Sequence, residues 1–224
     1  MSDFQAPKYN LSFKLMTKLI MHLTSNFKVT GLENLIDPPF IMISNHLQYA
    51  DIFAIAEAIP HDMIGMGAKK IQHKMIGRIF NVGPVIWIEQ ESPDLQALKQ
   101  AIRTVKQGYA LVLSPEGHRS KKPGMLPARD GAAYIANRVN IPIVPVGLTG
   151  THLILQHPRP NVTVTVGKPF TLPEGRASVE ELQIYTEYMM CTIATLLPET
   201  YHGHYANHPL IDQIRRGAYL NGKP

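Results

Sequence analysis

Short apolar runs alternate along the chain with longer stretches in which apolar residues recur at helical spacing. The short runs predict buried strands, because a strand covered on both faces reads as continuously hydrophobic. The predicted strands cover residues 27–30, 40–45, 63–67, 84–88, 109–113, 141–147 and 162–166. The predicted helices cover residues 10–24, a segment after Asp51, residues 92–108 and 130–140, and a long segment after Ser178. Strands that alternate with helices predict an α/β sandwich.

Several element ends carry recognisable signals. Ser92 is expected to cap a helix that has Pro93 at its first position and ends at Gly108. Ser178 and Glu181 match the capping-box pattern at the start of the last long helix. The run 162–166 alternates between valine and threonine, which is typical of an edge strand.

Two segments are both basic and amphipathic. Residues 10–24 carry an apolar face and a basic face, and the segment after residue 68 repeats the arrangement. The apolar face of the first holds Leu11, Leu15, Leu19, Ile20 and Leu23, and the basic positions are Lys14, Lys18, His22, Lys70, Lys74 and Arg78. Each segment either packs on the domain with a solvated basic edge or lies on an anionic lipid surface.

Length and composition limit the possible architecture, partners and location of the protein. The 224 residues fit one compact domain, with an N-terminal amphipathic helical region at 1–30 and the main domain at 31–224. A net charge of +5 favours anionic partners, and on charge alone these include phosphorylated substrates, acidic lipids and nucleic acid. The single Cys191 allows no internal disulfide, which indicates a reducing compartment. The apolar stretch 15–23 is shorter than the roughly 20 residues that span a bilayer and lacks a signal-peptide cleavage pattern, so we expect a protein that is not secreted and touches a membrane only peripherally.

Candidate chemistry lies where two predicted strands end. Asn45 and His46 follow the strand at 40–45, with Asp51 at the mouth of the next helix, and the cluster 114–120 follows the strand at 109–113. The carboxylate of Asp51 can accept the Nδ1 proton of His46 and leave Nε2 as a base. Because the chain has no G-x-S-x-G elbow, direct attack by a substrate hydroxyl is the simplest mechanism.

At this point the sequence resembles a known family, the glycerolipid acyltransferases of the lysophosphatidic acid acyltransferase type. Their H-x-x-x-x-D motif is similar to His46 through Asp51, and their F-P-E-G-T-R-S block is similar to Ser114-Pro115-Glu116-Gly117-His118-Arg119-Ser120. Their Pro-containing apolar strand is similar to Ile143-Val144-Pro145-Val146. The resemblance spans residues 30 to 170 and implies a single-domain sandwich with a mixed central sheet flanked by helices.

The resemblance implies transfer of a fatty acyl group from an acyl-CoA or acyl-carrier-protein thioester to a lysophospholipid hydroxyl, as in phospholipid biosynthesis. His46 would be the base and Asp51 its orienting carboxylate. The acceptor-binding residues would be Asn45, Lys70, Glu116, Gly117, Arg119 and Ser120. The residues lining the acyl donor or acyl chain would be Val144, Pro145 and Val146. It further implies no metal or bound cofactor, and a place at the cytoplasmic face of a membrane, on anionic lipid rather than nucleic acid.

Three positions depart from the family pattern. The family's second motif ends in an arginine that contacts the acceptor phosphate, whereas the matching stretch here ends in Glu89 and Gln90. His118 replaces the family's threonine, and Ser114 replaces its phenylalanine. Either Lys69 or Lys70 supplies the missing charge, or the acceptor is a different lipid.

Other interpretations stay open. A hydrolase would use His46 to activate water on an ester or thioester, and a non-catalytic module would use the basic helices to bind lipid. His202, His204 and His208 are spaced like metal ligands, but Gly203 and Pro209 interrupt them and no cysteine lies nearby, so we expect no metal there.

Overall fold

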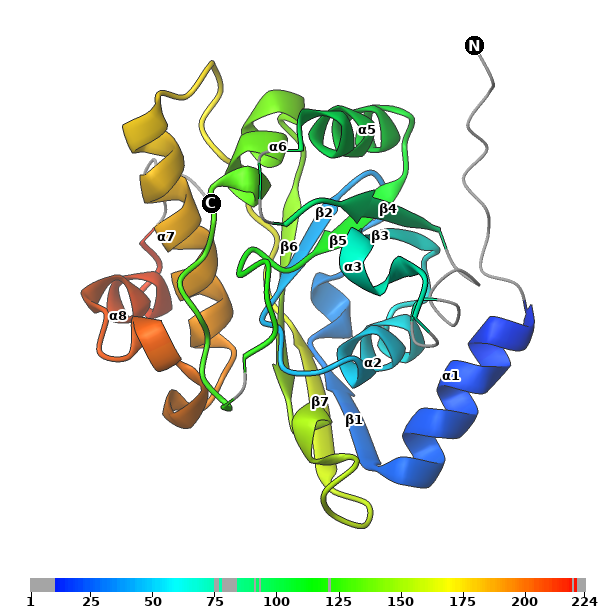
Figure 1. Ribbon diagram of the computed structural model, residues 1–224. Coiled ribbons are helices and arrows are strands. Elements are labelled where there is room, and N and C mark those ends of the chain that lie inside the picture. The colour runs from blue at the N-terminus through cyan, green and yellow to red at the C-terminus, as the bar shows by residue number, and fades with distance from the viewer. Residues whose placement is uncertain are drawn as a thin grey trace.

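A mixed β-sheet runs through the molecule, with helices on both faces (Figure 1). The computed structural model describes residues 11–74, 77, 84–90, 92, 94–120, 122–218 and 220. Within these residues seven strands lie in the order β1-β7-β6-β2-β5-β3-β4. Their bounds are Asn26–Thr30 (β1), Ile41–Ser44 (β2), Met63–Ala68 (β3), Val85–Ile88 (β4), Ala110–Leu113 (β5), Ile143–Thr149 (β6) and Asn161–Val166 (β7).

Strand direction decides where the polar clusters meet. The strands β6, β2, β5, β3 and β4 are mutually parallel, whereas β7 is antiparallel to β6 and β1 is parallel to β7. The carboxyl ends of β2, β5 and β6 therefore lie at one edge of the sheet, the edge at which open α/β sheets bind their ligands. This arrangement confirms the predicted α/β fold with a mixed central sheet.

The helices divide between the two faces (Figure 1). Each face has its own apolar core. One face is covered by α5 (Leu95–Lys106), α6 (Gly131–Val139) and α7 (Val179–Thr195), and α8 (Pro209–Arg215) packs against α7. The other is covered by α1 (Leu11–Thr24), α2 (Ala50–Ala58) and the short α3 (Lys69–Gln72). The sheet is thus buried on both sides, as its continuous apolar runs predicted.

One helix start was predicted correctly and another was not. Ser178 accepts from the N–H of Glu181 at 3.2 Å, and the Glu181 carboxylate accepts from the N–H of Ser178 at 2.7 Å, so the capping box of α7 is confirmed. The cap of α5 is Asp94 rather than Ser92, because the Asp94 carboxylate accepts from the N–H of Ala97 at 3.0 Å. Pro93 lies outside the described residues.

The alternating strand β7 is not at the edge of the sheet, contrary to its prediction. It lies between β6 and β1, and β1 takes the edge position. The alternation has another cause: Val162, Val164 and Val166 are buried against the core, whereas the threonines between them are half-buried. The pairing of β1 with β7 also joins residues 26–30, part of the predicted N-terminal region, to the central sheet.

Helix α1 turns its leucine row to solvent. Its buried side chains are Phe13, Thr17 and Met21, whereas Leu15, Leu19 and Leu23 are 58%, 60% and 62% exposed. The sequence left open whether this segment packs on the domain or lies on lipid. The helix packs on the domain, but it does not do so through these three leucines. The helix is apolar on more than one side, and the phenylalanine and methionine fill the space on the sheet.

Only the beginning of the second basic segment can be described. Lys70 lies in α3 and Lys74 just beyond it, whereas Arg78 and the apolar residues around it lie outside the described residues.

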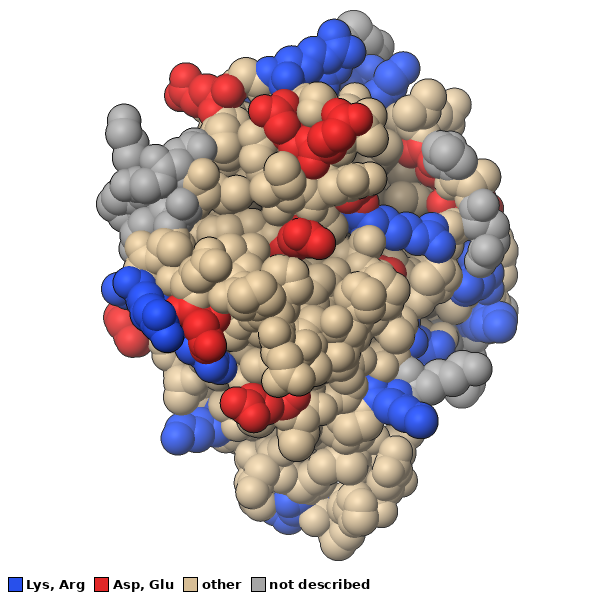
Figure 2. Space-filling model, turned by 90° about the vertical axis from the view of Figure 1, so that its left-hand side faces the viewer, with Lys and Arg blue, Asp and Glu red and all other residues tan. Residues whose placement is uncertain are grey.

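Figure 2 views the molecule from the side of α7 and α8 in Figure 1. It shows acidic and basic side chains scattered around a broad uncharged area. Among the residues drawn in colour, this face thus presents no continuous basic surface.

Candidate active site

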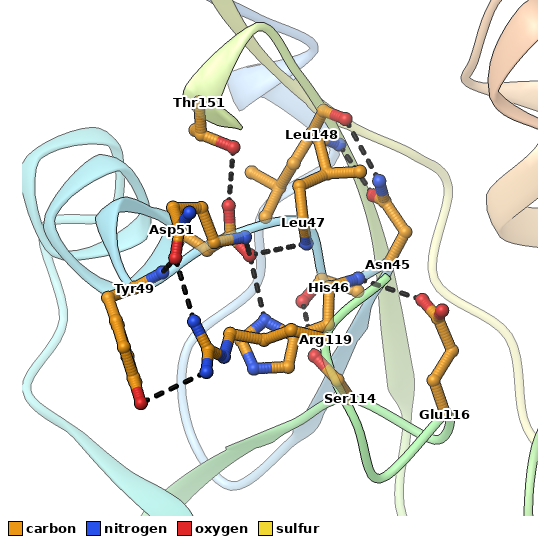
Figure 3. A network of polar contacts seen from close by, with 12 residues as sticks. Asn45, His46, Leu47, Tyr49, Asp51, Ser114, Glu116, Arg119, Leu148 and Thr151 are labelled. Atoms are coloured by element: carbon orange, nitrogen blue, oxygen red, sulfur yellow. Dashed lines mark hydrogen bonds and ion pairs between the residues drawn. The ribbon is translucent and has the colours of Figure 1, made fainter. Parts of the chain in front are cut away.

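His46 lies at the carboxyl edge of the sheet, where the chain leaves β2. His46 Nδ1 lies 2.8 Å from Oδ2 of Asp51, which comes from the first turn of α2 (Figure 3). The same oxygen accepts from the backbone N–H groups of Leu47 at 2.7 Å and Gln48 at 2.9 Å. The carboxylate can only accept in this arrangement, so Nδ1 carries the proton and Nε2 presents its lone pair. Sequence reasoning predicted this pair, and the structure brings the two side chains into contact.

Thr151 completes the environment of the carboxylate. Its hydroxyl donates to Oδ1 of Asp51 from the short 3-10 helix Thr151–Leu153 that follows β6 (Figure 3). Asp51 and Thr151 are 3% and 1% exposed, so this carboxylate is buried and both of its oxygens accept hydrogen bonds. Buried charge is tolerated when it is fully hydrogen-bonded.

The loop 114–120 clamps the backbone of His46. The Glu116 carboxylate accepts from the N–H of His46 at 2.8 Å and from the N–H of Leu126 at 2.7 Å, and the N–H of Ser120 donates to the carbonyl of His46 at 2.9 Å. Burial raises the pKa of Glu116 to about 7, although both N–H donors act in the opposite direction. Both carboxylate oxygens of Glu116 thus accept from backbone N–H groups, so Glu116 positions His46 instead of facing a ligand.

Asn45 holds the other side of the same strand end. Its amide donates to the carbonyl of Leu148 at 2.9 Å and accepts from the N–H of Leu148 at 2.8 Å. This double hydrogen bond ties the end of β2 to β6 and is fully buried. The predicted contact of Asn45 with substrate thus has no geometric support, because the amide is occupied by backbone.

Arg119 reaches the mouth of the site in front of His46. Its guanidinium donates to Oε1 of Gln48 at 2.8 Å and to the hydroxyl of Tyr49 at 3.0 Å, and its central carbon lies 3.7 Å from the centroid of the Tyr49 ring (Figure 3). Gln48 and Tyr49 lie inside the H-x-x-x-x-D motif, so the variable positions of that motif orient the arginine. A fork of donors held in this way suits a phosphate or carboxylate.

A cavity of about 1090 Å³ opens beside His46, as bounded by the described residues. Its polar mouth includes His46, Asp51, Lys70, Gly117, Arg119 and Ser120, all predicted at the site. Apolar side chains continue the wall between α1, α2 and β3, among them Phe13, Ile52, Ile55, Ile71 and Val112. Gly65 keeps this part open, since a Cβ there would meet only Val112, at 4.0 Å.

Three predicted lining residues are placed elsewhere. Val144, Pro145 and Val146 lie in β6, buried between β2 and β7, and the cavity wall does not include them. Their predicted role in lining the acyl group has no geometric support, because the apolar wall comes from α1, α2, β3 and β5 instead. Cys191 is buried in α7, where burial raises the pKa of its thiol to about 12, so it is no nucleophile.

The charge predicted to replace the family's missing arginine does not come from Lys69. Its ammonium group lies 2.9 Å from the Asp94 carboxylate that caps α5. The hydrogen bond from the N–H of Ala97 is the largest cause that holds the pKa of Asp94 well below its usual range, and the contact with Lys69 is the second. Lys70 lines the cavity, and so does Arg129, which sequence reasoning missed.

One of the C-terminal histidines, His202, has structural surroundings. His202 is buried, and its Nε2 lies 2.9 Å from the carbonyl of Ala194 and 3.2 Å from that of Leu197, near the end of α7. In the described part of the chain, no group of three or more His, Cys, Asp or Glu side chains is placed to hold a metal ion.

We expect Thr151→Val to lower kcat/KM about tenfold, the cost of one hydrogen bond to a buried charge. Valine keeps the shape of threonine but cannot donate to Asp51, whereas Thr151→Ser keeps the donor and should retain most of the activity. The measurement is steady-state kinetics beside thermal unfolding. Equal activity of the valine variant and the parent protein would show that Thr151 has no part in positioning Asp51.

The fold and the His46–Asp51 pair together define an α/β protein with a candidate base at the carboxyl edge of its sheet. The sequence profile described as "Acyltransferase" matches residues 26–149, which contain both motifs. The chain therefore belongs to this acyltransferase family.

Individual relatives point the same way. The chain is 33% identical over 117 residues to a 1-acyl-sn-glycerol-3-phosphate acyltransferase of Limnanthes douglasii, covering 50% of this chain and 42% of that protein. It is 31% identical over 170 residues to the protein of that name from Cocos nucifera, covering 71% and 54%. The chain thus spans about half the length of these relatives.

A solved structure shares the fold. The crystal structure of the 1-acyl-sn-glycerophosphate (LPA) acyltransferase PlsC from Thermotoga maritima superposes with a TM-score of 0.66 at 23% identity, covering 83% of this chain and 77% of that one.

Proposed function

We propose that this protein transfers a fatty acyl group from a thioester, acyl-CoA or acyl-carrier protein, to the hydroxyl of a lysophospholipid, with 1-acylglycerol-3-phosphate as the first acceptor to test. The observation that carries the proposal is His46, whose Nε2 is left as a base by the Asp51 contact at 2.8 Å and which lines a cavity with a polar mouth and a long apolar wall. A lipid with a charged head and a hydrocarbon chain matches both parts.

The proposed reaction uses His46 as its base. Nε2 takes the proton of the acceptor hydroxyl as the oxygen attacks the thioester carbonyl, the new C–O bond forms, the C–S bond breaks, and the thiolate recovers the proton from the imidazolium. Asp51 stabilises the imidazolium through its buried negative charge. Because the acyl group comes from the thioester, the reaction requires no resident cofactor or metal.

The direct test is thiol release by the purified protein from acyl-CoA and from acyl-carrier protein, each with and without lysophosphatidic acid. The proposal expects release that depends on the acceptor, together with formation of the diacyl product. Release at the same rate without an acceptor would identify a hydrolase instead, and the donor that supports turnover would decide between the two carriers.

We further propose that α1 binds the surface of an anionic membrane through Leu15, Leu19 and Leu23. These side chains follow one another at intervals of four residues and are exposed, with Lys18 exposed on the same helix. An exposed apolar row with flanking cations is typical of interfacial helices. No helix among the described residues combines the length and the hydrophobicity needed to cross a bilayer.

Replacing Leu15, Leu19 and Leu23 together by serine should weaken co-sedimentation with anionic liposomes at least tenfold, because these three leucine side chains no longer enter the lipid. A matched control replaces Val179 and Ile184, which are 65% and 54% exposed on α7 at the opposite face of the sheet, and should bind as the parent protein does. Unchanged binding of the α1 variant, or equal loss in both variants, would exclude α1 as the lipid-binding surface.

A further inference from the structure

We propose that Arg129 is a second phosphate-binding residue of this site and acts with Arg119 on the phosphate of the acceptor. The inference rests on the proposed function and specifies the acceptor as a lipid with a phosphate monoester next to its glycerol backbone. Both arginines line the cavity that His46 faces.

The chain places Arg129 beside the turn that carries the polar cluster. Its backbone N–H donates to the carbonyl of Pro115 at 3.0 Å, directly before α6 begins at Gly131. Its side chain then passes over Gly117, where an added Cβ would lie 3.7 Å from Cδ of Arg129. Gly117 has a φ of +68°, a conformation that favours glycine, and the arginine side chain lies at van der Waals distance from this turn.

The partners of Arg129 are neutral. Its guanidinium donates to the backbone carbonyl of Gln90 and to Nε2 of His118, the latter at 3.1 Å. Since a guanidinium can only donate, Nε2 of His118 accepts, and the imidazole proton lies on Nδ1. Arg119 is likewise oriented by an amide and a phenol.

Neither positive charge is neutralised by an ion pair in the described part of the chain. Two of the carboxylates that line the cavity have other partners, since Asp51 pairs with His46 and Asp94 with Lys69. A charge that is oriented but not neutralised keeps its full attraction for an anion. The cavity mouth is therefore prepared for an anionic group that the substrate supplies.

The position of Arg129 also accounts for two departures from the family pattern. The strand end at Glu89 and Gln90 lacks an arginine, and Arg129 reaches the carbonyl of Gln90 from another element. His118, which stands where threonine was expected, is the other residue that Arg129 contacts. Glu89 lines the same cavity, and its negative charge offsets part of the positive charge of Arg119 and Lys70, so Arg129 makes the mouth more positive.

The test is the kinetics of Arg129→Gln with two acceptors, lysophosphatidic acid and the monoacylglycerol with the same acyl chain. We expect KM for lysophosphatidic acid to rise about tenfold or more with little change in kcat, because a phosphate remote from the reacting hydroxyl contributes to binding in ground and transition states alike. Arg129→Lys keeps the positive charge but loses the fork of donors, so its KM for lysophosphatidic acid should lie between those of the parent protein and Arg129→Gln. The monoacylglycerol parameters should not change.

A matched control is Arg138→Gln. Arg138 lies in α6, which begins two residues after Arg129, and it is exposed, as Arg129 is. It contacts Tyr134 but does not line the cavity. It should behave as the parent protein does. The proposal is overturned if Arg129→Gln leaves KM for lysophosphatidic acid unchanged, or if both acceptors lose activity equally, which would indicate a structural role.

Failure of the proposed function would be visible separately. If the parent protein transfers no acyl group to any lysolipid, isothermal titration with glycerol 3-phosphate still tests the site. Weaker binding by Arg129→Gln than by Arg138→Gln would support it, whereas equal binding, or no binding by the parent protein, would overturn it.

Discussion

Replacing His46 by Asn should lower kcat by about 10²- to 10⁴-fold, the range that a general base contributes. An asparagine amide can still donate to Oδ2 of Asp51 from near the position of Nδ1, but it has no atom in place of Nε2. The backbone of residue 46 should stay in place, because Glu116 and Ser120 hold its N–H and carbonyl rather than its side chain. The loss therefore reports the base and not the fold.

The measurement is acyl transfer by His46→Asn and His46→Ala beside liposome binding and thermal unfolding. Both variants should lose turnover and keep lipid binding. A non-catalytic lipid-binding module predicts instead that neither substitution matters to any activity of the protein. Turnover within about threefold of the parent protein in both variants would exclude His46 as the base.

The placement of His46 beside Asp51 could be predicted from sequence because it depends on local features. An apolar run followed by polar residues marks the end of a buried strand, and two such ends carry the motifs of His46 and of Glu116. Neighbouring parallel strands end at the same edge, so β2 and β5 bring the clusters together. Alternation of strands and helices was also sufficient for the fold class.

The roles of several residues could not be predicted because they depend on partners far away in the chain. Asn45 is paired with Leu148 and Asp51 with Thr151, both about a hundred positions later. Their polar side chains looked available for a ligand or for one another, and only the folded backbone shows which contacts form. Thr151 follows β6 at the same edge as His46, but the predicted strand ended at residue 147, which hid that placement.

The facing of α1 escaped prediction for a different reason. A helix with phenylalanine and methionine as well as leucine has more than one apolar row, so periodicity alone does not say which row meets the sheet. Packing selects Phe13 and Met21 and leaves the leucines outside. The same ambiguity affected β7, whose alternation is compatible with an edge or an interior position.

Asp51→Asn should lower kcat by about 10³-fold while leaving the site in place. An asparagine oxygen at the position of Oδ2 can accept from His46, Leu47 and Gln48, and the amide nitrogen at the position of Oδ1 can donate to the hydroxyl of Thr151, which also accepts. What is lost is the negative charge, and a unit charge about 4 Å away contributes about 4 kcal/mol at an effective dielectric constant of 20.

A double-mutant cycle tests whether Thr151 acts through the negative charge of Asp51. Thr151→Val should cost about tenfold in the parent protein and less than about threefold in the Asp51→Asn background, because its hydroxyl then no longer orients a carboxylate that stabilises the imidazolium. Additive losses would mean that the two residues act independently. A normal kcat for Asp51→Asn would mean that the carboxylate only orients the ring, since the amide preserves orientation and removes charge alone.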